Sequence, residues 1–204
     1  MQLRELSGQA GRALRLSRRR LAQVDLDRLP VPDTRAAKDA EEICRALPAH
    51  IANHSHRTYL WGAVLAAHDG IEYDPELLYV ACLLHDAGLP AAVEAGDERC
   101  FTVRSSELAS ERSAAAGWSP ARQDALAESI TLHLNPSVGV DLGPEAHLVN
   151  AGAALDIVGM RRGQIGRDTA RAVVQPIRGR RSRRSSSRRC ARTPPPRRGP
   201  AGTR

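Results

Sequence analysis

The chain has 204 residues, of which 42% are apolar and 3% aromatic, and its formal net charge is +7. This length suits one domain of roughly 100–200 residues with additional segments, and it argues against two full-sized domains. Lys38 is the only lysine, so 29 of the 30 cationic side chains are arginines.

The positive charge is concentrated at the C-terminal end. Residues 176–204 contain eleven arginines and no acidic residue, and removing these arginines leaves a formal charge of −4 for residues 1–175. Only four apolar side chains lie in residues 176–204, too few to offset the roughly 1–2 kcal/mol per residue that ordering a backbone costs. We therefore expect a disordered Arg/Pro/Ser-rich tail, and we expect any binding of nucleic acid only there, through neutralisation of phosphates by arginine.

The cysteines and the apolar runs indicate the environment of the protein. Four cysteines lie 38, 18 and 90 residues apart, which excludes a C-x-x-C pair and a dense disulfide framework: Cys44, Cys82, Cys100 and Cys190. A reducing, cytoplasmic setting fits this spacing. No apolar run approaches the roughly 18 residues that a membrane span needs, so we expect no membrane segment.

The apolar periodicity predicts an all-α fold. It is helical rather than alternating, and all six aromatic residues lie between positions 59 and 118, where we expect the core. Short breaks rich in Gly, Pro, Asn and Asp separate segments rich in Ala, Leu, Arg and Glu. In chain order, the predicted helices are residues 3–24, 34–47, 49–68, 75–87, 104–116, 119–134, 144–159 and 163–174.

These helices suggest three parts of the chain. We expect an N-terminal helical extension at residues 1–29, a helical domain at residues 30–175 and the basic tail at residues 176–204. Within the domain, the helix at residues 75–87 is apolar on every side, which predicts a central helix covered by the others. It ends in His85 and Asp86, two ionisable groups that need partners at the end of a buried helix.

Four positions on or near apolar helices carry possible metal chemistry. They are His54, the adjacent pair His85 and Asp86, His133, and Asp156. Imidazole nitrogens and carboxylate oxygens are common ligands of divalent transition metals. Adjacent residues lie about 100° apart around a helix axis, so both side chains of the His-Asp pair can reach one ion at a helix end.

These residues resemble the signature of the HD-domain superfamily of metal-dependent hydrolases, which is His, then His-Asp, then Asp, spread over a helical bundle. Further strings resemble its cyanamide hydratase-like branch: Pro-Asp-Thr at 32–34, Asn-His-Ser-x-Arg at 53–57, Leu-His-Asp-x-Gly at 84–88, Gly-Trp-Ser-Pro at 117–120, Leu-His at 132–133 and Ala-x-Leu-Asp-x-x-Gly at 153–159. The likeness covers about residues 30–174. It departs from the family at Cys100–Glu107, where Phe101 is kept but the expected acidic residue and the small Gly-Ala helix start are missing.

The resemblance implies a ligand set and a reaction. Its metal ligands correspond to His54, His85, Asp86 and Asp156, and the ion would be Zn, Fe or Mn. An ion with an open coordination position lowers the pKa of bound water from about 15.7 towards 7. We expect metal-activated water to add to a small-molecule substrate, as in a cyanamide hydratase-like hydration of a nitrile.

The catalytic candidates are Asp86, His133 and Arg57. Asp86 or Asp156 could orient the water or take its proton, and His133 could return a proton, complete a second metal position or meet the substrate. Arg57 lies three residues after His54, where it could stabilise an anion or pair with Asp86, and a purely structural ion pair is an equal alternative.

Other residues are expected to be structural. Trp61, Tyr79 and Cys82 are predicted to be buried core residues, and the histidines at 56, 68 and 147 are predicted to lie on the surface or support the fold. Two other functions stay open at this point. One is a phosphohydrolase of a nucleotide or other phosphoester, and the other is a catalytically degraded protein that binds RNA or a partner through its tail. The sequence leaves the oligomeric state open.

Overall fold

The computed structural model describes residues 21–95 and 99–175. In this part of the chain the elements are helical, as the sequence predicted, with one isolated β-bridge between Ala22 and Ile165. The longer elements are α2 (Arg35–Ala46), α3 (Ala49–Asp69), α4 (Pro75–Leu84), α5 (Leu89–Ala95), α6 (Phe101–Ala115), α7 (Pro120–Thr131), α8 (Pro144–Val158) and α9 (Arg167–Val174), and the 3-10 turns are η1 (Leu26–Arg28), η2 (Leu132–Leu134), η3 (Val140–Leu142) and η4 (Arg162–Gln164).

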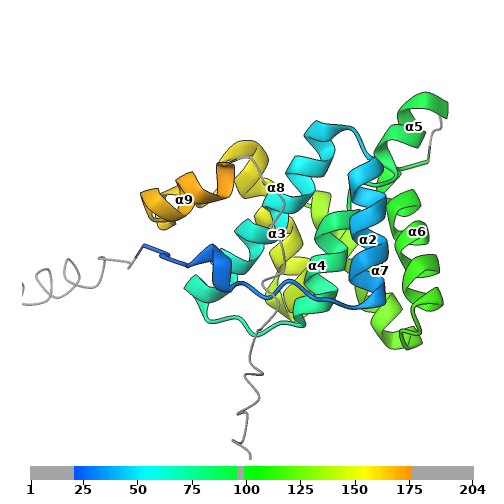
Figure 1. Cartoon of the computed structure of the whole chain (residues 1–204), viewed down its shortest axis with the longest axis horizontal. Coiled ribbons are helices and arrows are strands. Elements are labelled where there is room, and N and C mark those ends of the chain that lie inside the picture. Colours follow the sequence, from blue (N-terminus) through cyan, green and yellow to red (C-terminus); the bar gives the residue numbers. More distant parts are fainter. Residues whose placement is uncertain (1–20, 96–98, 176–204) are drawn as a thin grey trace, which may run out of the picture.

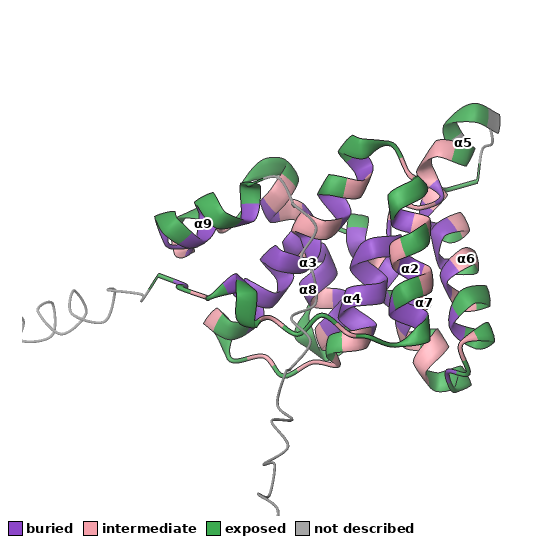
Figure 2. Ribbon diagram, viewed as in Figure 1, coloured by how far each residue is buried: buried purple, intermediate pink, exposed green. Residues whose placement is uncertain are grey.

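Helix α4 lies at the centre of the bundle, which confirms the prediction from its apolar sequence. Every residue from Leu77 to Leu84 is buried, and α2, α3, α6, α7 and α8 all contact this helix (Figures 1 and 2). Asp74 caps its N-terminus by accepting hydrogen bonds from the backbone N–H groups of Glu76 and Leu77, with Pro75 in the first turn. The end of α4 is therefore fixed in the interior, where His85 and Asp86 follow.

Helices α3 and α8 cross at close range because glycines stand at the crossing. A Cβ on Gly152 would collide with the carbonyl oxygen of Thr58 and lie 3.1 Å from the backbone nitrogen of Gly62. A Cβ on Gly62 would lie 3.0 Å from the carbonyl oxygen of Leu148. This close approach brings the first half of α3, which carries His54, beside the last turn of α8, which carries Asp156.

The structure corrects several predicted boundaries. Residues 21–24 are not helical, because the N–H of Ala22 donates to the carbonyl of Gln164 and its carbonyl accepts from Gly166 instead of bonding within a helix. Helix α5 occupies a stretch that was predicted as a break, and α6 begins at Phe101 rather than at 104. The predicted helices at 119–134 and 163–174 each include a 3-10 turn, η2 and η4.

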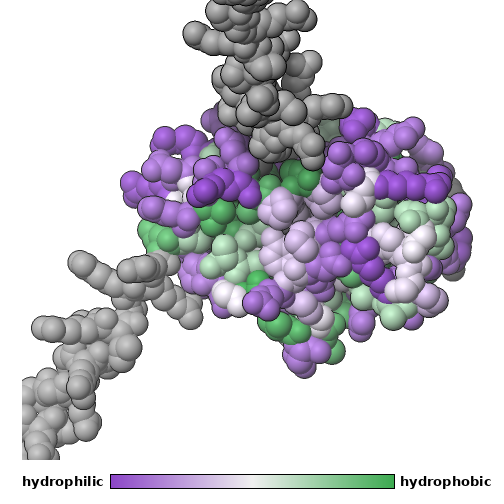
Figure 3. All heavy atoms as spheres, turned by 60° about the horizontal axis from the view of Figure 1, so that its bottom comes forward, coloured by the Kyte–Doolittle hydropathy of each residue, from purple (hydrophilic) through white to green (hydrophobic). Residues whose placement is uncertain are grey.

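Residues 21–29 pack on the same core as the rest of the described chain. Ala22 and Leu26 are buried, and η1 contacts α9. The predicted helix over residues 3–20 and the predicted disordered tail at 176–204 lie outside the described residues. Among the described helices, none combines the length and the apolar character that crossing a bilayer requires. On the face drawn in Figure 3, hydrophobic side chains reach the surface in patches bordered by hydrophilic ones.

Candidate metal centre

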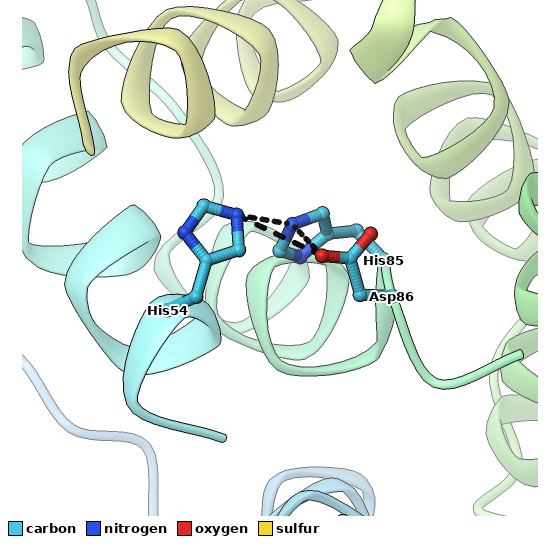
Figure 4. Close-up of side chains that lie close together, drawn as sticks. All are labelled: His54, His85 and Asp86. Atoms are coloured by element: carbon cyan, nitrogen blue, oxygen red, sulfur yellow. Dashed lines mark hydrogen bonds and ion pairs between the residues drawn. The ribbon is translucent and has the colours of Figure 1, made fainter. Parts of the chain in front are cut away.

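The side chains of His54, His85 and Asp86 meet in the interior of the bundle. His54 projects from α3, while His85 caps the C-terminus of α4 and Asp86 follows it in the next turn (Figure 4). The two Nε2 atoms lie 3.2 Å apart, and Oδ2 of Asp86 lies 3.7 Å from Nε2 of His54 and 3.4 Å from Nε2 of His85. One ligand atom from each of the three residues lies within 4.8 Å of the other two. The chain thus brings together three of the four predicted ligands.

Hydrogen bonds to the far side of each ring fix which nitrogen faces this cluster. Nδ1 of His85 lies 2.8 Å from the carbonyl oxygen of Cys82, and Nδ1 of His133 lies 2.6 Å from that of Ile130. A carbonyl oxygen only accepts, so each Nδ1 must donate its proton. In a neutral imidazole the Nε2 atom then carries a lone pair, and burial lowers the pKa of His85 to about 4, which keeps its ring neutral near pH 7.

The same reasoning applies to His54, whose outer partner is a carboxylate. Its Nδ1 points away from the cluster (Figure 4) and lies 2.8 Å from Oδ2 of Asp156. The resulting Nδ1–H donation leaves a lone pair on Nε2, opposite the lone pair of His85. Two lone pairs at 3.2 Å beside a carboxylate repel one another unless a proton or a cation lies between them. This donor set of two imidazole nitrogens and one carboxylate oxygen fits a divalent transition metal ion.

His133 lies at the edge of the cluster. Its Nε2 is 3.5 Å from Oδ1 of Asp86, the oxygen that does not face His54 and His85. Its ring packs edge-to-face on His85 with the centroids 4.7 Å apart, and the ring of Phe101 lies 6.0 Å away. Asn150 holds the turn in place by donating to the carbonyl oxygens of His133 and Asn135. His133 therefore reaches Asp86 rather than the centre of the cluster.

Asp156 occupies the other side of His54. Arg57 donates to both of its oxygens, from Nε at 2.7 Å and Nη2 at 2.9 Å, and Trp61 Nε1 donates to Oδ1 at 3.0 Å. Burial alone would raise the pKa of Asp156, but the hydrogen bonds from His54, Arg57 and Trp61 hold it well below its usual range. The structure does not bring Asp156 into the group of three, so its assignment as a ligand stays a prediction.

These contacts correct the expected partner of Arg57 and extend the role of Trp61. Arg57 pairs with Asp156, not with Asp86. Trp61 is buried as predicted, and its indole N–H also donates a hydrogen bond to Asp156. The sequence carried a signal for this, because positions 57 and 61 are one helical turn apart and follow His54 on nearly the same face. The hydrogen bonds to the carbonyl oxygens of Cys82 and Ile130 could not be predicted, because every residue has a backbone carbonyl and the sequence does not mark which one accepts.

The turn after the His-Asp pair is held tightly against α6. The N–H of Gly88 donates to Oγ of Ser105 at 2.9 Å. A Cβ on Gly88 would lie 2.6 Å from the carbonyl oxygen of Phe101 and 2.8 Å from the Cβ of Arg104, so only glycine fits. The remaining histidines predicted to be structural make local contacts instead, and His147, for example, bonds to the carbonyl oxygen of Val138 at 2.6 Å.

Comparison with known proteins agrees with this geometry. No curated protein matches the chain. The HD domain family model matches residues 51–158, which is more than half of the chain and spans every candidate from His54 to Asp156. The expectation of a helical bundle of the HD-domain type is thereby confirmed, while the narrower likeness to cyanamide hydratases stays a prediction. The chain belongs to the HD domain family, whose members are typically metal-dependent hydrolases.

Proposed function

We propose that this protein is a metal-dependent hydrolase or hydratase that holds a divalent cation on His54, His85 and Asp86. The observation that carries the proposal is the convergence of two Nε2 lone pairs and one carboxylate oxygen within 4.8 Å of one another. The donor set suits Zn, Fe or Mn. When bound, such an ion lowers the pKa of a coordinated water from about 15.7 towards 7 and polarises the substrate.

We assign Asp156 to the orientation of His54 rather than to coordination. Its Oδ2 receives the Nδ1 proton of His54, and Arg57 and Trp61 fix the carboxylate from its other sides. A carboxylate behind a ligating imidazole holds the ring in one tautomer and strengthens the nitrogen that faces the metal. Arg57 is then a positioning residue that acts through Asp156.

Asp86 and His133 would handle the protons of the reaction. Oδ2 of Asp86 faces the two ligand histidines, while Oδ1 lies 3.5 Å from Nε2 of His133. Asp86 can therefore orient the attacking water, and His133 can carry a proton at Nε2 because its Nδ1–H is committed to Ile130. In a nitrile hydration the oxygen of water would bond to carbon as one carbon–nitrogen π bond breaks, the water would lose a proton to Asp86, and His133 would give its proton to nitrogen.

The motif strings support a small nitrile such as cyanamide as the substrate, and a phosphoester is the other class to test. The guanidinium of Arg57 is neutralised by Asp156, which weakens the case for phosphate binding by this arginine. Purified protein should be assayed with cyanamide, simple nitriles, nucleotides and other phosphoesters after reconstitution with Zn, Fe or Mn. If the protein turns over phosphoesters and no nitrile, the proposed hydration is wrong and the protein is a phosphohydrolase.

Metal content tests the site independently of the substrate. We expect about one equivalent of a divalent metal by elemental analysis of the wild-type protein and a large loss in His54→Gln. The matched control is His50→Gln, because His50 lies on α3 as well and is exposed. Absence of tightly bound metal from reconstituted wild-type protein, or equal retention by both variants, would overturn the proposal.

A further inference from the structure

A cavity lies on the side of α3 that faces away from His54. It measures about 580 Å³, opens to solvent, and is lined by residues of α2, the first half of α3, the segments before and after α2, and Tyr79 of α4. His56, Tyr59 and Leu60 line it from α3, and at about 100° per residue His56 lies some 200° around the helix from His54. Its volume falls in the range of about 300–1,000 Å³ that small-molecule sites occupy.

The carboxylate of Glu41 at this cavity is already satisfied by the protein. Tyr79 donates its hydroxyl to Oε1 of Glu41, while Nε of Arg45 lies 3.4 Å and Nε2 of His56 lies 3.8 Å from Oε2. Burial and the neighbouring Glu41 raise the pKa of Tyr79, so this hydroxyl stays protonated and keeps donating. Glu41 thus organises the cavity wall and has little capacity left for a ligand.

The charged donors that remain at the cavity belong to Arg45 and Lys38, and the neutral amide of Asn53 lines it as well. Arg45 uses its Nε on Glu41, which leaves the terminal nitrogens of its guanidinium, and Lys38 bonds to the exposed Asp33 at 2.7 Å. Of the ionisable residues that line the cavity, Lys38 and Arg45 are positive and Glu41 is negative, so the formal charge of the lining is +1 with His56 neutral, before Asp33, the exposed partner of Lys38, is counted. Burial lowers the pKa of His56, which favours its neutral form.

Apolar surface accompanies these cations. Val31, Pro32, Leu47 and Leu60 line the same cavity, together with the ring of Tyr59. Val31 is half exposed, although it is a large apolar side chain. An apolar wall with a few cationic donors is the usual composition of a site for an amphipathic anion.

We propose that this cavity binds a small organic anion, with its carboxylate or phosphate on Arg45 and Lys38 and its apolar body against Val31, Leu47 and Leu60. The site is independent of the metal centre, since none of the residues that line it contributes to the His54, His85 and Asp86 cluster. It gives the protein a second small-molecule ligand, bound on the opposite face of the helix that carries His54.

The single lysine of the chain provides the test. Reductive methylation of the full-length protein with ¹³C-formaldehyde keeps the charge of Lys38 and labels one side chain besides the α-amine. The dimethyl resonance of Lys38 is then followed by proton–carbon NMR during titration with phenyl phosphate, phenylacetate, inorganic phosphate and neutral benzyl alcohol. We expect saturable shifts with phenyl phosphate or phenylacetate, and the stronger of the two identifies the anionic group.

The variants Arg45→Gln and Arg35→Gln distinguish binding in the cavity from nonspecific attraction of anions to positive charge on the surface. Both arginines lie on α2 and are about equally exposed, but only Arg45 lines the cavity. We expect Arg45→Gln to weaken binding about tenfold, as expected for the loss of a charged hydrogen bond, and Arg35→Gln to leave it unchanged. Equal weakening by both variants, a shift that never saturates, or equal binding of benzyl alcohol would each overturn the proposal.

Discussion

The carboxylate of Asp156 receives hydrogen bonds from three side chains of one helix, and this makes its role testable. We expect Asp156→Asn to weaken metal binding by roughly 10–100-fold, because the Nδ1 proton of His54 loses its ionised acceptor. Competition with a chelator measures the affinity, and Asp168→Asn is the control, because Asp168 is an exposed residue of α9. In cobalt-substituted protein, the absorption bands should keep their positions in Asp156→Asn. A change in the coordination bands would instead identify Asp156 as a ligand.

Trp61 offers a milder change in the same network, because its substitution removes one donor to Asp156 and leaves every predicted ligand in place. Trp61→Phe keeps an aromatic ring in the core and removes the Nε1 donor at 3.0 Å from Asp156 together with part of the indole. We expect a loss of metal affinity of a few-fold, smaller than that of Asp156→Asn, since Arg57 still holds the carboxylate. Chelator competition measures both variants, and unchanged affinity in Trp61→Phe would show that the indole N–H serves only packing.

His85 should make the stability of the metal-free protein depend on pH. Burial lowers its folded pKa to about 4, below the unfolded value near 6.5, so the unfolded chain binds more protons between these values. The free energy of unfolding is therefore expected to fall as the pH falls, by about 2 kcal/mol between pH 7 and pH 5. Urea unfolding in the presence of a chelator measures this loss. It should be much smaller in His85→Gln and unchanged in His50→Gln.

The convergence of His54, His85 and Asp86 was predictable because each stands at a marked place in an apolar helix. The His-Asp pair ends the all-apolar helix, and His54 stands within a long helix of the same domain. The place of Asp156 was not predictable. A carboxylate within reach of an imidazole can bind the metal or the opposite ring nitrogen, and the choice depends on where the donors of Arg57 and Trp61 lie.

At the scale of the elements, the crossing of α3 and α8 tolerates little added volume. We expect Gly152→Ala to destabilise the protein by about 1–3 kcal/mol, because its methyl group would collide with the carbonyl oxygen of Thr58 in a packed interior. The control is Gly163→Ala, where a Cβ would meet nothing within 4 Å. Urea denaturation measures the free energy of unfolding of the two variants. Equal values would mean that α3 and α8 can move apart with no loss of stability.

The helices were predictable where caps and apolar stripes agree. Pro75 and Asp74 start α4, and Gly159 ends α8 in a left-handed conformation that favours glycine. Helix α5 was missed because Gly88 and Pro90 are typical of a loop, yet packing on α6 stabilises this short helix. The stretch at 21–24 was predicted to be helical, but its backbone pairs with residues 164–166, a partner that no local pattern can reveal.

At the scale of the whole molecule, burial should divide the three cysteines among the described residues into reactive and protected ones. Burial raises the pKa of Cys44 to about 12 and also raises that of Cys82, whereas a hydrogen bond with Thr102 lowers the pKa of exposed Cys100. Since the thiolate is the reactive form, we expect a thiol reagent to modify Cys100 rapidly in the native protein. Cys44 and Cys82 should react only on unfolding, as peptide mass spectrometry of timed samples can show. Modification of Cys82 before Cys100 would contradict the buried position of α4.

The candidate metal centre draws its side chains from helices that are distant in the chain, and this has a thermodynamic consequence. His54 belongs to α3, His85 and Asp86 follow α4, and the support from Asp156 comes from α8. No such arrangement survives in an extended chain, so the cation discriminates between folded and unfolded forms. At a free concentration a thousand times its dissociation constant, it would add about 4 kcal/mol to the native state. The rate of proteolysis should therefore fall as the cation concentration rises. This measurement gives the affinity for the cation and requires no known substrate.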